Sequence, residues 1–460
     1  MSYAYDLQSL LYKVPVQLHS ADAGTGSYRL SYEDLLDKVR TAMTRQYPEL
    51  IREAISSKEA QQKMRMLITK HVHEQRFAVA DQGMEKLQTV IDKLHDDMFG
   101  FGILTPYLYD EKVQEINVNR WDDIEIIYPD GYRKLTEKFT SPQQAQDVAK
   151  KMARLGGVTV DGSTPDGDSQ ITEGVRVHVK VPPIIDDKAG VHISIRKQRR
   201  EAFSRAEFIK RGTATAEELD LLSLALSHGV SIGIAGSAGS GKTTDVNYLL
   251  NTVPPHLRIY IIEEAREIQL ERQDENGIYI SRVMHTKTRH HTNASFHIDA
   301  RKLVRDALWC DPNIIVPAEM RGAEALDVME AGRTGHTIIS TFHAQGSEDA
   351  YRRIASMAMM AGAGYSEDTL LKFAYASFPL MVHKMKLPDG TLKYVEISEA
   401  QHLPNDEYKV VPLYSFIPSD TSSDGHIIGD HKQLSYLSDA LVHRLRLGGA
   451  SAEQLKPFIK

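Results

Sequence analysis

The sequence predicts a mixed α/β protein with three parts. We expect an all-α module over residues 1–98, a small α+β domain over 99–200, and an α/β domain with a parallel sheet over 201–460. Three observations lead to this expectation: helical spacing dominates the beginning, short strands with turns follow, and strand and helix patterns alternate from Thr215 onward. The length of 460 residues is about three times a typical domain of roughly 150 residues, which agrees with this division.

The first module is expected to be helical because apolar residues between Ser31 and Met98 recur at spacings of three and four, with few Gly or Pro residues. Ser31 can accept a hydrogen bond from a free amide of the first helix. Asp34, three residues later, favours the positive helix end. The pattern stops at the glycine-rich residues 99–102.

The middle block mixes strands and turns. We expect strands over 124–128, 175–181 and 191–195, with turns at 129–131 and at Pro182-Pro183. One helix is expected over 143–155, ended by Gly156-Gly157. The basic stretch 197–210 is expected to link this block to the next.

The third block begins with a helix capped by Thr215 and Glu218 and ending near Gly229. Further strands are expected over 230–235, 257–262, 313–316 and 336–341, and helices over 242–251 and 299–310. The amphipathic segment 434–447 is expected to dock onto its own domain; binding of a partner is the alternative.

Composition excludes several classes of protein. Against 55 Lys+Arg there are 62 Asp+Glu, a net charge of −7, which disfavours nucleic acid as a partner but leaves a local basic groove possible. The single cysteine, Cys310, excludes an internal disulfide and is expected to be a small buried residue. We recognise no signal peptide and no apolar run of roughly 20 residues, so no transmembrane segment is expected and membrane association would be peripheral.

A phosphate-binding motif lies between an expected strand and an expected helix. The sequence from residue 236 matches G-x-x-x-x-G-K-[ST], in which glycines let backbone amides turn toward one anionic centre. Lys242 would add charge at the β- and γ-phosphates, and the Thr243 hydroxyl is a hard ligand for Mg²⁺. The alternative is a structural glycine-rich turn. The expected nucleotide-binding residues are Gly236, Ser237, Ala238, Gly239, Ser240, Gly241, Lys242, Thr243 and Thr244.

Acidic residues and one histidine follow the expected strands. Glu263 and Glu264 end one strand, and Glu319 ends another, so these carboxylates could orient a water or hold metal-bound waters at the ligand edge of a parallel sheet. Each could instead be an ordinary solvated strand cap. His343, after a strand ending in Ser-Thr-Phe, could reach a γ-phosphate, although a lone histidine is more often structural.

A second histidine group is weaker. His285, His290, His291 and His297 lie within thirteen residues, but without helical spacing or a cysteine partner. A solvated loop is the favoured interpretation over a metal site.

Together these motifs resemble the secretion and pilus-assembly traffic ATPases of type II and type IV secretion. The P-loop and the stretches 262–268, 319–322 and 335–344 are similar, in order, to that family's Walker A, Asp box, Walker B and His box. The likeness extends upstream to residues 101–108, 115–119, 174–177 and 195–197 and covers about residues 99–416. Two departures are Pro317-Ala318 before Glu319, where the family usually has Gly, and Glu264 in place of the commoner Asp.

The resemblance implies several properties. It implies a RecA-like C-terminal domain in a homohexameric ring, ATP with Mg²⁺, and Arg176 and Arg196 completing the nucleotide site. It also implies an inner-membrane platform protein as partner and a peripheral position at the cytoplasmic face. With one cysteine, the chain lacks the four-cysteine zinc module usual in the extension ATPases, so it looks more like the Tad/Flp-pilus branch and its conjugation-associated relatives.

Three functions remain open at this point. The first is an ATP-driven motor whose domains close on ATP binding, for pilus assembly, secretion or conjugative transfer. The second is a nucleic-acid translocase, which the acidic balance disfavours. The third is a non-hydrolysing nucleotide switch or scaffold, suggested by the Pro317-Ala318 departure.

Overall fold

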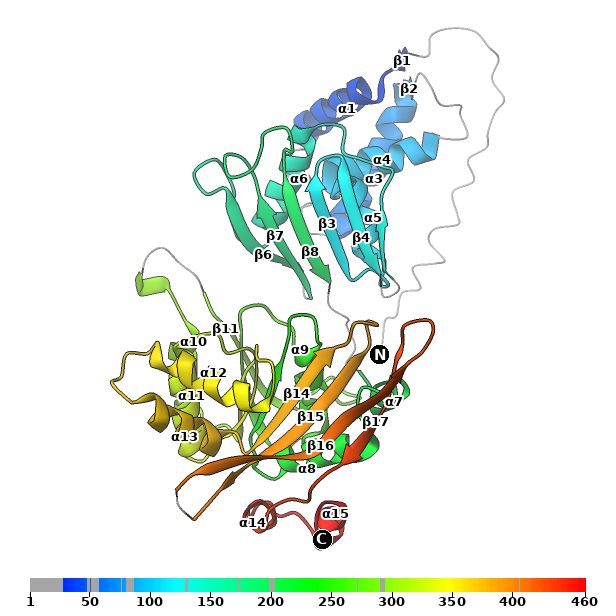
Figure 1. Ribbon diagram of the computed structural model, residues 1–460. Helices are drawn as coiled ribbons and strands as arrows, with labels where there is room; N and C mark the ends of the chain where they lie inside the picture. The colour runs from blue at the N-terminus through cyan, green and yellow to red at the C-terminus, as the bar shows by residue number, and fades with distance from the viewer. Residues whose placement is uncertain are drawn as a thin grey trace.

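The computed structural model describes residues 28–47, 50, 58–75, 77–79, 87–128, 131–172, 174–197, 203–270, 272–289, 294–404 and 406–460. Within these residues the strands form sheets of two, six and nine strands (Figure 1). The predicted mixed α/β architecture is confirmed. The boundaries at residues 98 and 200 stay predictions.

The N-terminal module is mainly helical, as expected. Its helices are α1 (Tyr32–Gln46), α3 (Lys58–Glu74) and α4 (Leu87–Phe99). The Ser31 hydroxyl accepts a hydrogen bond from Asp34 N at 3.1 Å, which confirms the predicted cap. Leu35, Ile68 and Leu94 are fully buried in a core between the helices. Residues 1–27 of the predicted module lie outside the described residues.

The expectation of an all-α module is wrong in one respect. The strands β1 (Tyr28–Leu30) and β2 (Phe77–Val79) pair in parallel and form a small sheet. Each strand has three residues, which is too short for a period of two to stand out in the sequence.

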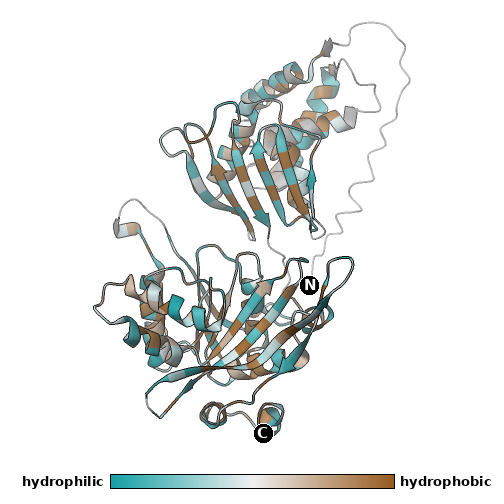
Figure 2. Ribbon diagram, viewed as in Figure 1, coloured by the Kyte–Doolittle hydropathy of each residue, from teal (hydrophilic) through white to brown (hydrophobic). Residues whose placement is uncertain are grey.

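The middle block is a six-stranded antiparallel sheet in the order β5-β4-β3-β8-β7-β6. The predicted strands and helix are confirmed as β4 (Asp123–Tyr128), β7 (Val175–Lys180), β8 (His192–Lys197) and α6 (Pro142–Leu155). The turn at 129–131 lies partly outside the described residues. The additional elements are η2 (Gly102–Leu104), α5 (Thr105–Tyr109), β3 (Glu115–Arg120), β5 (Gly131–Lys134) and β6 (Asp166–Thr172). Brown and teal bands alternate along these strands in Figure 2, because one face packs on the core.

The nine-stranded sheet has the order β11-β10-β12-β13-β9-β14-β15-β16-β17. Its first six strands are parallel, which confirms the predicted parallel sheet, and the last three run antiparallel. Four of the six parallel strands were predicted, and β11 and β14 were not. The parallel strands are β9 (Ile232–Gly236), β10 (Arg258–Glu263), β11 (Arg282–Lys287), β12 (Ile314–Pro317), β13 (Thr337–Phe342) and β14 (Leu380–Lys386). The antiparallel extension, which the sequence did not predict, is β15 (Leu392–His402), β16 (Tyr408–Thr421) and β17 (Ile427–Gln433).

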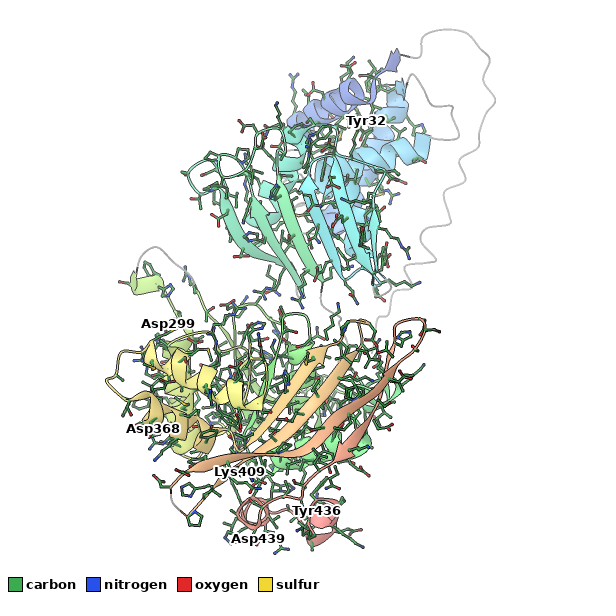
Figure 3. The ribbon with its side chains drawn as sticks, viewed as in Figure 1. Tyr32, Asp299, Asp368, Lys409, Tyr436 and Asp439 are labelled. Atoms are coloured by element: carbon green, nitrogen blue, oxygen red, sulfur yellow. The ribbon has the colours of Figure 1, made fainter. Side chains whose placement is uncertain are left out.

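Helices cover both faces of this sheet. Those packed on one core are α7 (Arg205–Lys210), α8 (Ala216–Ser227), α9 (Lys242–Thr252), α14 (Asp439–Leu447) and α15 (Ala452–Leu455) with η4 (Lys456–Phe458). Those on the other are α10 (Ala300–Trp309), α11 (Glu324–Arg333), α12 (Ser347–Met359) and α13 (Glu367–Ser377); the short η3 (Ala294–Phe296) precedes them. In Figure 3, Asp299 lies at the start of α10 and Asp368 in α13.

Two expectations need correction here. The stretch 197–210 is not all linker, because Arg205–Lys210 form α7, capped reciprocally by Ser204 and Glu207, with Phe208 in the core. Cys310 is half-buried and not fully buried, because it caps the end of α10.

Among the described helices, none combines the length and apolarity that crossing a bilayer requires.

The C-terminal segment docks onto its own domain, as predicted. Leu437, Leu441 and Leu445 are buried in the same core as β9 and α8. The carboxylate of Glu399 on β15 accepts a hydrogen bond from Ser438 N at 3.0 Å, just before α14. The tail therefore completes the core beneath the sheet.

This docking yields a stability prediction. Leu445→Ala is expected to destabilise the protein by about 2–5 kcal/mol, because Leu445 is fully buried and its loss leaves a cavity. Leu447→Ala, two residues away and 77% exposed, is the matched control and should change stability by less than about 0.5 kcal/mol. Thermal unfolding measures both, and equal melting temperatures would argue against docking of the tail.

Candidate functional site

The site begins at the turn between β9 and α9, where the backbone requires glycine. Gly241 is the N-cap of α9 and has a left-handed φ of 81°. A Cβ at Gly236 would lie 2.2 Å from the Lys384 carbonyl oxygen on β14, so no larger residue fits there. Ser240 Oγ donates to Ser237 O at 2.9 Å and closes the turn. The turn therefore presents backbone amides at the positive end of a helix, which suits an anion.

Lys242 is the first residue of α9 and is buried against this turn. Its Nζ donates to Gly236 O at 2.9 Å and to Ser237 O at 3.0 Å. Burial lowers the pKa of the Lys242 ammonium, and the charge of Glu319 partly offsets this effect. Thr243 and Thr244 follow in the first helical turn and are half-buried.

Glu319 is held just beyond the end of β12 by both neighbouring strands. Ala318 N donates to Ile262 O at 2.9 Å, and Met320 N donates to Thr341 O at 2.9 Å. The Thr341 hydroxyl donates to Ala318 O at 2.8 Å. These bonds fix the backbone on each side of Glu319 despite the unusual Pro317-Ala318 sequence.

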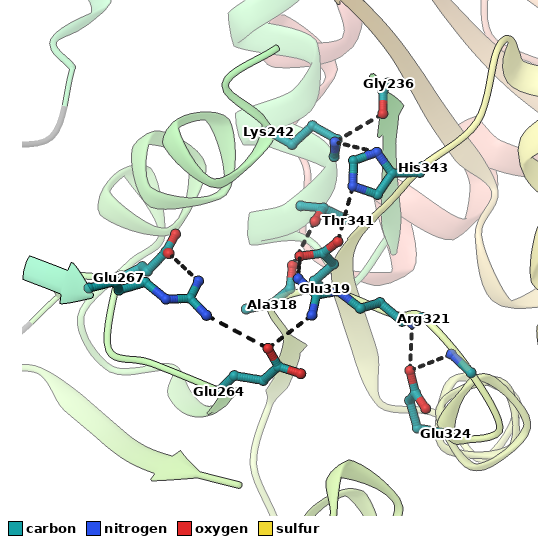
Figure 4. Close-up of polar contacts among 12 residues, drawn as sticks. Gly236, Lys242, Glu264, Glu267, Ala318, Glu319, Arg321, Glu324, Thr341 and His343 are labelled. Atoms are coloured by element: carbon teal, nitrogen blue, oxygen red, sulfur yellow. Dashed lines mark hydrogen bonds and ion pairs between the residues drawn. The ribbon is translucent and has the colours of Figure 1, made fainter. Parts of the chain in front are cut away.

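A row of polar side chains runs from the turn to Glu319 (Figure 4). His343 Nδ1 lies 3.5 Å from Lys242 Nζ, and His343 Nε2 lies 3.2 Å from Glu319 Oε1. The three residues come from α9, from the end of β13 and from the end of β12. The structure thus brings together the predicted P-loop lysine, the Walker B-like acid and the His-box histidine.

Arg321 extends this row to a second acid. Its Nη2 donates to Glu319 Oε2 at 2.7 Å, and its Nη1 donates to Glu264 Oε2 at 2.9 Å. Burial alone would raise the pKa of Glu319, but the hydrogen bond and charge of Arg321, together with the charges of His343 and Lys242, outweigh it, so the net pKa is lowered. Glu319 is therefore ionised at neutral pH.

The two adjacent acids Glu263 and Glu264 have different surroundings. Glu263 is buried, and its Oε1 accepts hydrogen bonds from Glu267 N at 2.9 Å and Ile268 N at 3.0 Å. Its Oε2 lies 3.7 Å from His285 Nδ1. These contacts shape the loop after β10, whereas Glu264 faces Arg321. The geometry favours Glu264 over Glu263 as a member of the site.

The two predicted arginines of the six-stranded sheet also differ. Arg176 on β7 donates from Nη1 to Glu267 Oε1 at 3.0 Å, and its Nη2 lies 3.7 Å from Glu264 Oε2. Arg196 on β8 stays 63% exposed, 4.0 Å from Glu115, and its charge adds a minor lowering effect to the pKa of Lys242. Only Arg176 contacts the acids beside the turn.

The histidine group is dispersed in the described part of the chain. His285 is nearly buried on β11 beside Glu263, whereas His297 is exposed. His290 and His291 lie outside the described residues. Among the residues the structure describes, no three His, Cys, Asp or Glu side chains are grouped so as to hold a metal.

Sequence reasoning missed Arg321, Glu267 and the ion pair Asp245–Lys384 beneath the turn, which is 2.6 Å long. For Arg321 a signal existed, because it lies two residues after Glu319. For Lys384, which is about 140 residues from the P-loop, no local pattern indicated the contact.

Comparisons with known proteins find similarity to type IV secretion system proteins. PtlH, a type IV secretion system protein of Bordetella pertussis, is 29% identical over 282 residues, 57% of this chain and 81% of that protein. VirB11, a type IV secretion system protein of Brucella suis, is 25% identical over 328 residues, 66% of this chain and 89% of that protein. The solved Legionella pneumophila ATPase DotB has a TM-score of 0.46 at 17% identity, over 65% of this chain and 80% of that one.

The family match spans the site itself. Residues 98–375 match the family described as Type II/IV secretion system protein. This range is more than half of the sequence, and it contains the turn after β9, Glu264, Glu319 and His343. The chain therefore belongs to the family of type II/IV secretion system proteins.

Proposed function

We propose that this chain is an ATPase that powers secretion, pilus assembly or conjugative transfer. The observation that carries the proposal is the row Lys242–His343–Glu319, with successive contacts of 3.5 Å and 3.2 Å, directly beside the glycine turn. A cation, an imidazole and an ionised carboxylate in this order suit a phosphate and its attacking water. Membership of a secretion-system family agrees with this chemistry.

The residues of the turn fit a nucleoside triphosphate. The backbone amides of residues 236–243 and the Lys242 ammonium would hold the phosphates, and the left-handed Gly239 and Gly241 let the turn close around them. Thr243 offers a hydroxyl for Mg²⁺, and Glu319 would act on it through water. When bound, Mg²⁺ would neutralise phosphate charge.

In this proposal Glu319 orients the attacking water and accepts its proton. Because Arg321 keeps Glu319 ionised, the carboxylate is available as a base at neutral pH. His343, in contact with both Lys242 and Glu319, would report whether the γ-phosphate is present. Glu264 would influence Glu319 indirectly, by holding Arg321 in place through their hydrogen bond.

Movement would come from the two larger sheets. Arg176 and Gln170 of the six-stranded sheet contact the loop after β10, at 3.0 Å from Glu267 and 3.4 Å from Arg266 O. ATP binding would close this junction and hydrolysis would release it. We further propose a homohexamer at the cytoplasmic face of the inner membrane, acting on a platform protein, with Arg196 completing the nucleotide site. The Tad/Flp assignment stays a prediction.

The test is hydrolysis by the purified chain, measured with Mg²⁺ and ATP in the presence and absence of single-stranded DNA. We expect turnover that DNA does not stimulate. Strong stimulation by DNA would favour a translocase, and tight nucleotide binding without turnover would favour a switch. A chain that neither binds nor hydrolyses nucleotide would contradict the proposal.

Arg321 gives a prediction about pH. In Arg321→Gln the burial of Glu319 is opposed only by the charges of His343 and Lys242, so the pKa of Glu319 rises. Because the ionised form is needed, the acidic limb of the hydrolysis profile should move to higher pH, with the largest loss of rate at low pH. Arg333→Gln, which removes an arginine paired with Glu330 on α11, is the control. Superimposable profiles for wild type and Arg321→Gln would show that Arg321 does not tune Glu319.

A further inference from the structure

A buried ion pair lies directly beneath the P-loop turn. Lys384 Nζ on β14 is 2.6 Å from Asp245 Oδ1 in the first turns of α9, and the two side chains are only 2% and 0% exposed. Burying two charges is costly, and apolar residues of similar volume are often at least as stabilising. Stability alone is therefore a weak explanation for this pair.

Lys384 contacts the turn at both of its ends. It pairs with Gly236 in the β9–β14 register, and its carbonyl oxygen is the atom that excludes a Cβ at Gly236. Its Nζ donates to Gly241 O at 3.3 Å, and a Cβ at Gly241 would lie 3.2 Å from that nitrogen. One residue thus touches the first glycine of the turn through its backbone and the last through its side chain.

The surroundings hold Lys384 in this orientation. The register with β15 shifts between His383 and Lys384, so that Lys384 pairs with Tyr394. The rings of Phe208 and Tyr394 each lie 5.6 Å from Nζ. Burial raises the pKa of Asp245 to about 6, and the charge of Lys384 opposes that shift.

We propose that Lys384, through its ion pair with Asp245, is a positioning residue of the nucleotide site that fixes the Gly241 carbonyl and the first turn of α9. Lys242 and Thr243 follow Gly241 directly, so this contact determines the direction in which they face. The turn needs such support because its glycines restrict the backbone little. The inference rests on the proposed function in treating this turn as the nucleotide site.

The decisive variant is Lys384→Met combined with Asp245→Leu, which removes both charges and fills the space with apolar side chains. We expect it to melt close to the wild-type temperature, while amides of residues 239–245 exchange with deuterium about tenfold faster without nucleotide, as expected for loss of a charged hydrogen bond. Affinity for Mg²⁺ with a nonhydrolysable ATP analogue should fall about tenfold as well.

The control is Lys393→Met, which removes a lysine on β15 whose Nζ donates to the Gly212 carbonyl at 2.7 Å. It should leave exchange at residues 239–245 and nucleotide affinity unchanged. Wild-type exchange and affinity in the double variant would overturn the proposal. If the double variant does not fold, Asp245→Asn, which keeps the shape, should accelerate exchange at the same amides, and unchanged exchange would overturn it.

The readouts separate this inference from the proposed function. Hydrogen exchange is measured without nucleotide, so it decides the positioning role even if the wild-type chain binds no ATP. If the double variant shows wild-type hydrogen exchange and binds ATP normally, the positioning role of Lys384 is contradicted, but the proposed function is not.

Discussion

Replacing Lys242 with alanine is expected to lower ATP hydrolysis by about 10³-fold and to weaken nucleotide binding. The ammonium is buried at the turn, where the attraction between a cation and a phosphate is stronger than in water. Lys242 Nζ donates to both the Gly236 and the Ser237 carbonyl of the turn, so alanine removes two hydrogen bonds together with the charge. Steady-state hydrolysis and binding of a fluorescent ATP analogue measure the two effects.

The fold should survive this change. Of the two carbonyls that Lys242 leaves, that of Ser237 belongs to the exposed part of the turn, so water can replace the ammonium there, whereas that of Gly236 is buried. Lys432→Ala, at an exposed position on the far edge strand β17, is the control and should behave as wild type. Unchanged turnover in Lys242→Ala would reject every hydrolytic role for this turn.

The second large effect is expected for Glu319→Gln, which should reduce hydrolysis by about 10²–10⁴-fold while nucleotide still binds. Glutamine keeps the shape and can still accept a hydrogen bond from Arg321, but it cannot take a proton from water. Single-turnover hydrolysis measures the loss, and retention of the ATP analogue measures binding.

Glu330→Gln is a suitable control for Glu319→Gln, because Glu330 is paired with Arg333 on α11 and not with the site. Intact hydrolysis in Glu319→Gln would assign the base to another carboxylate. Glu264, which shares Arg321 with Glu319, would then be the first residue to replace.

Strands β9, β10, β12 and β13 and helices α8, α9 and α10 were predictable because their apolar patterns are strong and their ends are marked, whereas β11 and β14 were not predicted. Thr215 and Asp299 cap α8 and α10 as their sequence positions suggest. The antiparallel strands β15 to β17 were not predictable, because buried and exposed residues are mixed along them. In addition, β16 carries Pro412 and Pro418. Strands β5 and β6 have few buried side chains, so no alternation marks them.

The site was predictable where it depends on topology. Parallel strands bring their carboxyl ends to one edge, so the proximity of Glu319 and His343 follows from the strand assignment. The different surroundings of Glu263 and Glu264 were not predictable from the sequence, because they depend on which donor each carboxylate meets: a loop amide for Glu263 and Arg321 for Glu264. The contact from Arg176 to Glu267 joins two sheets, and sequence spacing carries no information about how they approach.

The core that supports the P-loop joins side chains very distant in sequence, from Phe208 to Leu455 and Phe458. Closing such long loops has an entropic cost that slows folding. We therefore expect the domain around the nine-stranded sheet to complete its folding only after translation has passed Phe458. A product truncated before Leu455 would leave an apolar face for chaperones or for aggregation.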